Sequence, residues 1–349
     1  MTDPSPPVPP PAPPQTVVRL DPGALAPEAW SALGGSAVIC RADVSVLAVT
    51  GPGAVTCLQG LLTTDIEKPG DGAFIYGALL TAKGMIVVDG WASRRATTVT
   101  YTTPSELADR ALALFRRALP PRLARVSDTT QDVTVFRLAG PRALATAEAA
   151  GFTPPPTGGV LELEGERAWE LARASERAPF ALQLTVPARD ARRVTDRLAT
   201  AGAVVADPVA LEAARILAGW PRVGAETDEK TIPQEVRYDE IGGVSYTKGC
   251  YTGQETVSRL HFRGHANRVL RGLRFDETPT ERADVTRADH EVGRVTSLLW
   301  VPGSGAERAG WLGLAVLRRT VERDAVVRAA GRDARVVDLP FELPVRSPA

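Results

Sequence analysis

Cysteine is scarce in this 349-residue sequence, and its spacing excludes several kinds of site. The three cysteines, Cys40, Cys57 and Cys250, include no Cys-x-x-Cys pair. They therefore form neither a disulfide framework nor a zinc or iron–sulfur ligand set, which indicates a reducing compartment. We expect no resident metal.

Long apolar runs and net charge are absent as well. No run approaches the roughly 18 apolar residues of a membrane span, and the first residues lack the basic-then-apolar order of a secretion signal. We therefore expect a cytoplasmic protein without a membrane partner. The 41 basic and 41 acidic side chains cancel, so no overall field favours a nucleic-acid partner.

Common nucleotide-binding and hydrolase motifs are missing. No Gly-Lys dipeptide occurs, which excludes a Walker-type phosphate loop. The glycines of Gly51-Pro52-Gly53 do not complete a dinucleotide fingerprint, because Thr56 stands where its third glycine belongs. The segment from Gly243 to Thr247 lacks the final glycine of a nucleophile elbow.

What is present is the composition of a soluble globular protein. With 44% hydrophobic and 23% charged residues, the chain can bury a sizeable core, and its length suits two or three compact units. The pattern predicts an α+β fold in five parts. These are a disordered proline-rich tail (1–14), a first α+β lobe (15–140), a second α+β lobe (141–230), an irregular motif segment (231–265) and a small all-β barrel or sandwich (266–349).

The densest chemistry lies in the octapeptide from Lys248 to Glu255, KGCYTGQE. The spacing of Thr252 and Glu255 is that of a capping box, so a helix is predicted to begin just after Thr252. Cys250 would then precede a helix N-terminus, where the helix dipole and Lys248 favour a thiolate. In the alternative interpretation, Cys250 is a small buried residue and the glycines only serve the turn.

This octapeptide, with the trailing Arg259, resembles the signature of the YgfZ family. These are folate-binding relatives of the glycine-cleavage aminomethyltransferase that act in iron–sulfur cluster maintenance. The resemblance extends to four further segments and covers nearly everything after the proline-rich tail. The segments are 51–65 (GPGAVTCLQGLLTTD), 79–89 (LLTAKGMIVVD), 215–219 (RILAG) and the closing strands within 293–317.

The resemblance implies a cloverleaf of two α+β, ferredoxin-like lobes around a central folate channel, followed by a small β-barrel. In such a fold, the segment 231–265 returns to the first lobe. The implied cofactor is tetrahydrofolate or a one-carbon-substituted folate. The implied partners are this small molecule and, transiently, iron–sulfur client enzymes, with the protein itself acting as a monomer.

Two residues of the implied folate site, Glu170 and Arg215, match positions of the related aminomethyltransferases. Glu170 would read the pterin edge, and Arg215 would bind a carboxylate of the glutamyl tail. Tyr76 and Trp220 would offer flat surfaces. The alternatives are a solvent-facing Glu170, an Arg215 that pairs with Glu212 three residues earlier, and aromatic rings that only pack in the core.

Within the octapeptide, Cys250 is the implied reactive group and Lys248 the residue that lowers its pKa. Tyr251, Gln254, Glu255 and Arg259 complete the implied cofactor-binding set. Gln254 and Glu255 would order the loop, and Arg259 would hold the loop or an anionic ligand.

Two functions follow from these residues. The first is a tetrahydrofolate-binding accessory protein for iron–sulfur cluster assembly or repair, with a link to tRNA modification. The rival is a tetrahydrofolate-dependent one-carbon transferase with Asp89 as base or charge stabiliser. The rival is weakened because the aminomethyltransferases carry adjacent acidic residues where this chain has Val88-Asp89.

Overall fold

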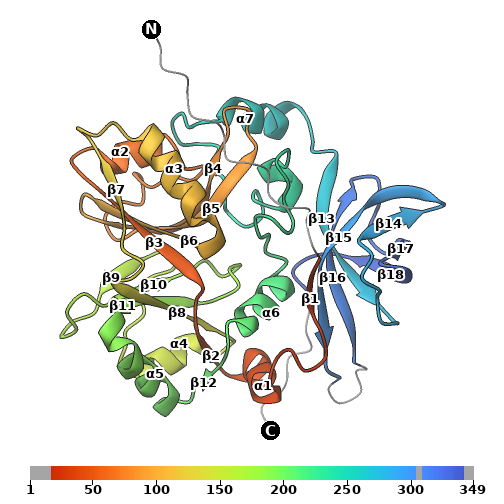
Figure 1. The fold of residues 1–349 in the computed structure, drawn as a ribbon, viewed down its shortest axis with the longest axis horizontal. Helices are drawn as coiled ribbons and strands as arrows, with labels where there is room; N and C mark the ends of the chain where they lie inside the picture. Colours follow the sequence, from red (N-terminus) through yellow and green to blue (C-terminus); the bar gives the residue numbers. More distant parts are fainter. Residues whose placement is uncertain (1–16, 304–308, 342–349) are drawn as a thin grey trace.

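The structure is a computed structural model that describes residues 17–303 and 309–341. Within these residues the chain forms two mainly antiparallel sheets that carry helices, and a closed β-barrel. The two sheets and the barrel lie around a common centre (Figure 1). No helix in this part is long and apolar enough to cross a bilayer. The predicted tail at 1–14 lies outside the described residues.

The first sheet has five antiparallel strands. Their order is β4 (Phe74–Leu80), β5 (Ile86–Arg95), β6 (Thr98–Pro104), β3 (Val44–Thr50) and β7 (Arg125–Asp128). Helix α3 (Ala108–Ala118) packs against β5, β6 and β7, and α2 (Ala54–Gln59) contacts β6. The apolar positions Ala111, Leu112 and Phe115 are spaced so that one face of α3 is buried, while Arg116 and Arg117 end the helix in solvent.

The second sheet has six strands. Their order is β12 (Val204–Val205), β2 (Val38–Arg41), β8 (Val133–Ala139), β11 (Leu182–Pro187), β10 (Glu170–Arg173) and β9 (Val160–Glu162). Its helices are α4 (Ala143–Ala149) and α5 (Ala191–Thr200). Strands β2 and β8, which precede residue 140, pair here and not in the first sheet, so sheet membership does not follow chain order.

The C-terminal region is a closed six-stranded barrel, which confirms the predicted all-β unit. Its strands are β13 (Arg268–Phe275), β14 (Asp284–Arg287), β15 (His290–Val301), β16 (Gly310–Arg318), β17 (Val326–Ala329) and β18 (Arg332–Val337). The barrel closes because β15 pairs with both β14 and β16. Strand β1 (Val18–Leu20) adds to β15 in parallel, so the start of the described chain lies against the barrel.

The remaining elements lie between these three units or along their edges. They are α1 (Pro27–Gly35), α6 (Val209–Ala218), α7 (Gln254–Arg263) and the short 3-10 turns η1 (Ser105–Leu107), η2 (Ala188–Asp190) and η3 (Pro233–Val236). Helix α6 ends at Gly219 in the left-handed conformation, which glycine adopts without steric cost. It contacts β2 and β8 of the second sheet and β15 of the barrel, which places it at the centre of the fold (Figure 1).

Candidate functional site

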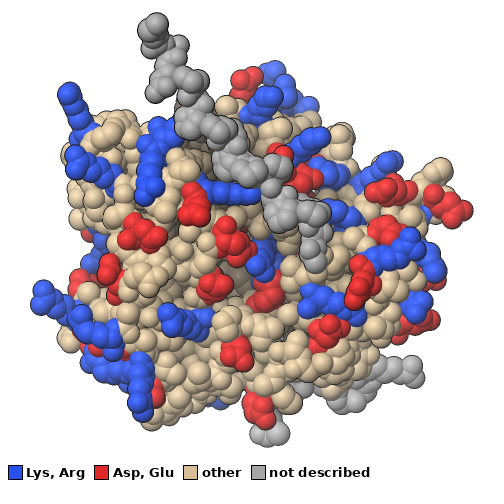
Figure 2. Space-filling model, in the orientation of Figure 1, with Lys and Arg blue, Asp and Glu red and all other residues tan. Residues whose placement is uncertain are grey.

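A cavity of about 430 Å³ lies where the two sheets, α6 and strand β1 meet. Figure 2 shows a hollow at the centre of this face, with acidic and basic side chains around it. Strands β4, β5 and β6 contribute walls from the first sheet, and β8 contributes one from the second. The charged residues that line the cavity are Asp43, Asp89, Glu106, Glu212, Arg137, Arg215 and Arg222. This volume is in the range typical of small-molecule sites.

Asp89 is a buried carboxylate in this cavity. Its Oδ2 accepts hydrogen bonds from the hydroxyl groups of Tyr76 at 2.6 Å and Tyr238 at 3.0 Å. Burial raises the pKa of Asp89, and the two hydroxyl donors offset part of that rise. Asp89 and Tyr76 are predicted from the sequence, whereas Tyr238 is not, because it comes from an irregular segment 149 residues further along the chain.

Aromatic rings form one wall of the cavity. The rings of Trp91 and Trp220 are nearly parallel, at 11° with centroids 6.0 Å apart, and Tyr76 meets Trp220 edge-on at 4.6 Å. Phe180 extends this wall with its centroid 5.1 Å from that of Trp91. The structure therefore brings Tyr76 and Trp220 together in the cavity, and it adds Trp91 and Phe180, which no sequence motif singles out.

Arg215 also lines the cavity, but its guanidinium is fully engaged by the protein. Its N–H groups make five hydrogen bonds to four acceptors, which are Oε1 of Glu212 (twice), Oε2 of Glu226, the Trp220 carbonyl and the Ser297 hydroxyl. The Glu212 contact, at 2.7 Å, is the i−3 pair that the sequence offered as an alternative. No N–H of Arg215 remains free for a ligand carboxylate in this arrangement.

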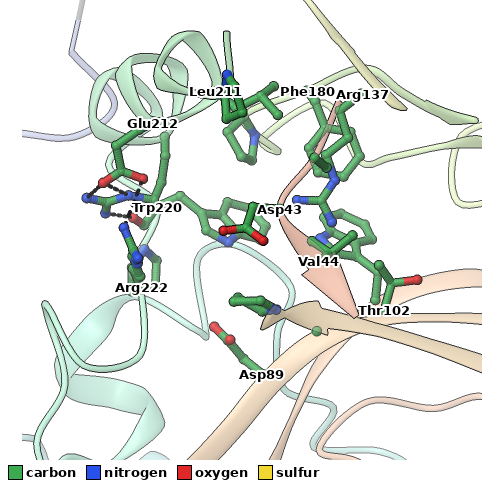
Figure 3. Close-up of a pocket in the computed structure, with 18 of the residues that line it drawn as sticks. Asp43, Val44, Asp89, Thr102, Arg137, Phe180, Leu211, Glu212, Trp220 and Arg222 are labelled. Carbon is green, nitrogen blue, oxygen red and sulfur yellow. Dashed lines mark hydrogen bonds and ion pairs between the residues drawn. The ribbon is translucent and has the colours of Figure 1, made fainter. Parts of the chain in front are cut away.

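The other two arginines of the cavity differ from Arg215. Arg222 pairs with Glu106 at 2.7 Å and with Glu212 at 3.7 Å. Arg137 lies beside Phe180 on the opposite side of the cavity from Glu212 and Arg222 (Figure 3). The sequence does not predict a role for Arg137, because nothing near it in the chain distinguishes it from other strand arginines.

Glu170 does not line this cavity. It begins β10, where it pairs with Glu162 of β9 and Thr185 of β11, and it is half-buried. Burial raises the pKa of its carboxyl, with Arg95 opposing and Glu162 reinforcing the rise. The predicted solvent-facing alternative is also not what the structure shows, because much of this side chain is covered.

The octapeptide forms a loop that is anchored by Lys248. The buried ammonium group donates to the backbone carbonyls of Gln59 at 2.6 Å, Leu62 at 2.7 Å and Thr64 at 3.0 Å. These three bonds use all three N–H groups, so Lys248 fixes the loop to the end of α2 and has no donor left for the Cys250 sulfur. Burial lowers the pKa of Lys248 to about 8.

Cys250 itself is exposed, so the interpretation of a small buried residue is wrong. A helix follows it as predicted, since α7 begins at Gln254. The predicted capping box at Thr252 is wrong, however. The N-cap is Gly253 with φ +83°, and no side chain caps the helix.

The other candidate residues of the octapeptide and of α7 also lie outside the cavity. Tyr251 is buried, and its ring centroid is 5.2 Å from Lys248 Nζ. Gln254 is half-buried, whereas Glu255 and Arg259 are exposed on α7. No residue of the segment 248–259 lines the cavity, so the structure separates the candidate residues into a cavity set and a loop set.

Comparison with known proteins agrees with this architecture. The family model for the GCVT N-terminal domain matches residues 28–152. A tRNA-modifying protein YgfZ of Serratia proteamaculans is 28% identical over 313 residues, which cover 88% of this chain and 92% of that protein. That of Edwardsiella ictaluri is 31% identical over 231 residues, 65% of this chain and 67% of that protein.

Among solved structures, the glycine cleavage system aminomethyltransferase T from Bartonella henselae shares the fold. The TM-score is 0.76 over 90% of this chain and 89% of that chain, at 19% identity. Together with the identity to the curated relatives and the matching domain model, this likeness shows that the chain belongs to the YgfZ family, with a fold like that of the aminomethyltransferase.

Proposed function

We propose that this protein binds tetrahydrofolate, or a one-carbon-substituted form of it, in the central cavity. It would do so as an accessory protein of tRNA modification and iron–sulfur cluster maintenance. The observation that carries the proposal is the cavity itself, in which a wall of flat aromatic rings stands beside the buried carboxylate of Asp89. The names of the YgfZ relatives support the link to tRNA modification.

The residues of the cavity fit a reduced folate. The faces of Trp91 and Trp220 suit a planar pterin or benzoyl ring. Asp89, held by two tyrosine hydroxyls, provides a fixed acceptor for ligand N–H groups. A bound folate would supply a one-carbon unit, while the protein would hold and orient it. Arg215 is excluded from ligand binding in this arrangement because all its donors are used.

In this proposal, Cys250 is the group that contacts the iron–sulfur client enzymes. It is exposed on a loop whose backbone is anchored by Lys248, so it can meet another protein without any unfolding. Three cysteines cannot build a four-thiolate cluster site, and Cys40 is buried. Contact with a cluster or a client is therefore transient, and the role of Lys248 is to shape the loop.

Anaerobic calorimetric titration with tetrahydrofolate tests the ligand. We expect saturable binding by the wild type and weaker binding by Trp220→Ala and Asp89→Asn. Glu170→Ala tests the pterin contact that the family resemblance implies. An unchanged affinity of this variant for tetrahydrofolate would mean that Glu170 does not contact the ligand. The absence of saturable binding by the wild type would refute the proposal that tetrahydrofolate is the cofactor.

The one-carbon transferase remains the rival function because Asp89 is a buried carboxylate with a raised pKa, as a general base requires. A cell that lacks its own copy of the gene separates the two functions when it is complemented with variants. Under our proposal, Cys250→Ala abolishes the activity of iron–sulfur-dependent tRNA modification yet leaves folate affinity intact. If Asp89→Asn binds folate but is inactive, and Cys250→Ala is fully active, the protein is a transferase.

A further inference from the structure

The three arginines of the cavity differ in how many of their N–H groups the protein already uses. Arg215 donates all five, and Arg222 donates through Nε and one amino group to Glu106. Arg137 donates only through Nε, to the side-chain oxygen of Gln183 at 3.1 Å. Within the described residues, neither amino group of Arg137 has a hydrogen-bond or ion-pair partner.

The position of Arg137 is fixed by the sheet. Arg137 on β8 lies directly opposite Gln183 on β11, so the hydrogen bond between them follows from the strand register. The guanidinium carbon also lies 4.4 Å from the ring centroid of Phe180, and this contact orients the plane of the group. Figure 3 shows Arg137 and Phe180 together at one side of the cavity. Four N–H donors are thus held in one plane without a protein acceptor.

The environment of Arg137 favours an added acceptor. The side chain is half-buried, and desolvation lowers its pKa to about 10, so the group stays protonated at neutral pH. The amino groups of Arg137 line the cavity without a protein acceptor, so an oxygen of a ligand can accept their hydrogen bonds in place of solvent. Arg137 therefore differs from Arg215, whose N–H groups all donate to acceptors of the protein.

We infer that Arg137 binds an oxygen acceptor of the folate through its two free amino groups and is the cavity's ligand-binding arginine. This inference rests on the proposed function. Folate offers such an oxygen in two places, the carboxylates of the glutamyl tail and the 4-oxo group of the pterin. Both suit the planar donor fork of a guanidinium.

Binding of three ligands to the wild type and to Arg137→Gln tests the inference. The ligands are tetrahydrofolate, tetrahydropteroate, which lacks the glutamate, and the 4-amino analogue of tetrahydrofolate, which lacks the 4-oxo group. We expect Arg137→Gln to weaken tetrahydrofolate binding by about 10-fold to 100-fold. The wild type should discriminate against one analogue by a similar factor, and Arg137→Gln should not, which identifies the source of the oxygen.

Two further variants control for folding and for charge. Arg117→Gln removes an exposed arginine at the end of α3 and should bind like the wild type. Arg137→Lys keeps the charge without the planar fork and should bind with intermediate affinity.

Unchanged affinity of Arg137→Gln for tetrahydrofolate, in a variant that melts like the wild type, would overturn the inference. An equal loss of affinity for all three ligands would overturn it as well, because the oxygen would then play no part. If the wild type binds none of the three ligands, the proposed function itself falls. If the wild type binds tetrahydrofolate and Arg137→Gln binds it equally well, only the role of Arg137 is overturned.

Discussion

Gly84 and Gly253 meet backbone to backbone, although 169 residues separate them in the chain. A Cβ atom added to Gly253 would lie 3.0 Å from the Cα of Gly84 and 2.5 Å from the carbonyl oxygen of Thr81. Gly84 belongs to the turn between β4 and β5, and Gly253 is the N-cap of α7. The first sheet and the octapeptide loop are thus joined where neither glycine can carry a side chain.

Gly253→Ala should therefore destabilise the fold. The residue has φ +83°, which an alanine tolerates poorly, and its methyl group would collide with backbone atoms that cannot move aside. We expect a loss of about 1–3 kcal/mol in the free energy of unfolding, measured by urea titration. Gly249→Ala is the matched control, because no atom lies within 4 Å of its added Cβ. Equal stability of the two variants would contradict this packing.

Lys248 should make stability depend on pH. Its pKa is lowered to about 8 in the folded protein, against about 10.4 in an unfolded chain. Between these values the unfolded state binds more protons, so the free energy of unfolding rises with pH, by up to about 3 kcal/mol. The difference between wild type and Lys248→Met should widen accordingly from pH 7.5 to pH 10.5 in urea titrations. A difference that stays constant over this pH range would contradict the lowered pKa of Lys248.

Asp89 and Tyr238 should be energetically coupled. Tyr238→Phe removes a hydrogen bond of 3.0 Å to a buried carboxylate, which raises the pKa of Asp89 further. A double-mutant cycle with Asp89→Asn should give a coupling energy of about 1–3 kcal/mol in unfolding measurements. Additive effects would mean that this hydrogen bond contributes no stability.

The sequence predicts elements well because their signals are local. The stop of α6 at Gly219 and the alternating strands of the barrel depend on residues within a few positions of each other. The predicted capping box is wrong by one residue, because the N-cap is Gly253 in the left-handed conformation. Gly253 packs against Gly84 of a distant turn, and the local sequence does not show this contact.

The cavity was only partly predictable for the same physical reason. Asp89 ends a segment that resembles a known family, and Tyr76 and Trp220 lie next to two such segments. The sequence does not single out Trp91, Phe180 or Arg137. Their importance depends on which strands lie side by side, and the strand pattern gives only the positions of the strands. The pairing of Arg215 with Glu212 is local and was predicted as an alternative, but the contacts of Arg215 with Glu226 and Ser297 join α6 to distant segments.

The three cysteines should differ in reactivity, in an order set by burial. Cys250 is exposed, Cys57 on α2 is half-buried, and Cys40 on β2 is buried with its pKa raised to about 12. Because the thiolate is the nucleophile, a maleimide at pH 7.5 should label Cys250 first, then Cys57, and Cys40 only after unfolding. Peptide mass spectrometry over time measures the three rates, with a urea-unfolded sample as control, in which all three should react alike. Labelling of Cys40 in the folded protein as fast as Cys250 would place β2 at the surface, which would contradict the position of β2 inside the second sheet.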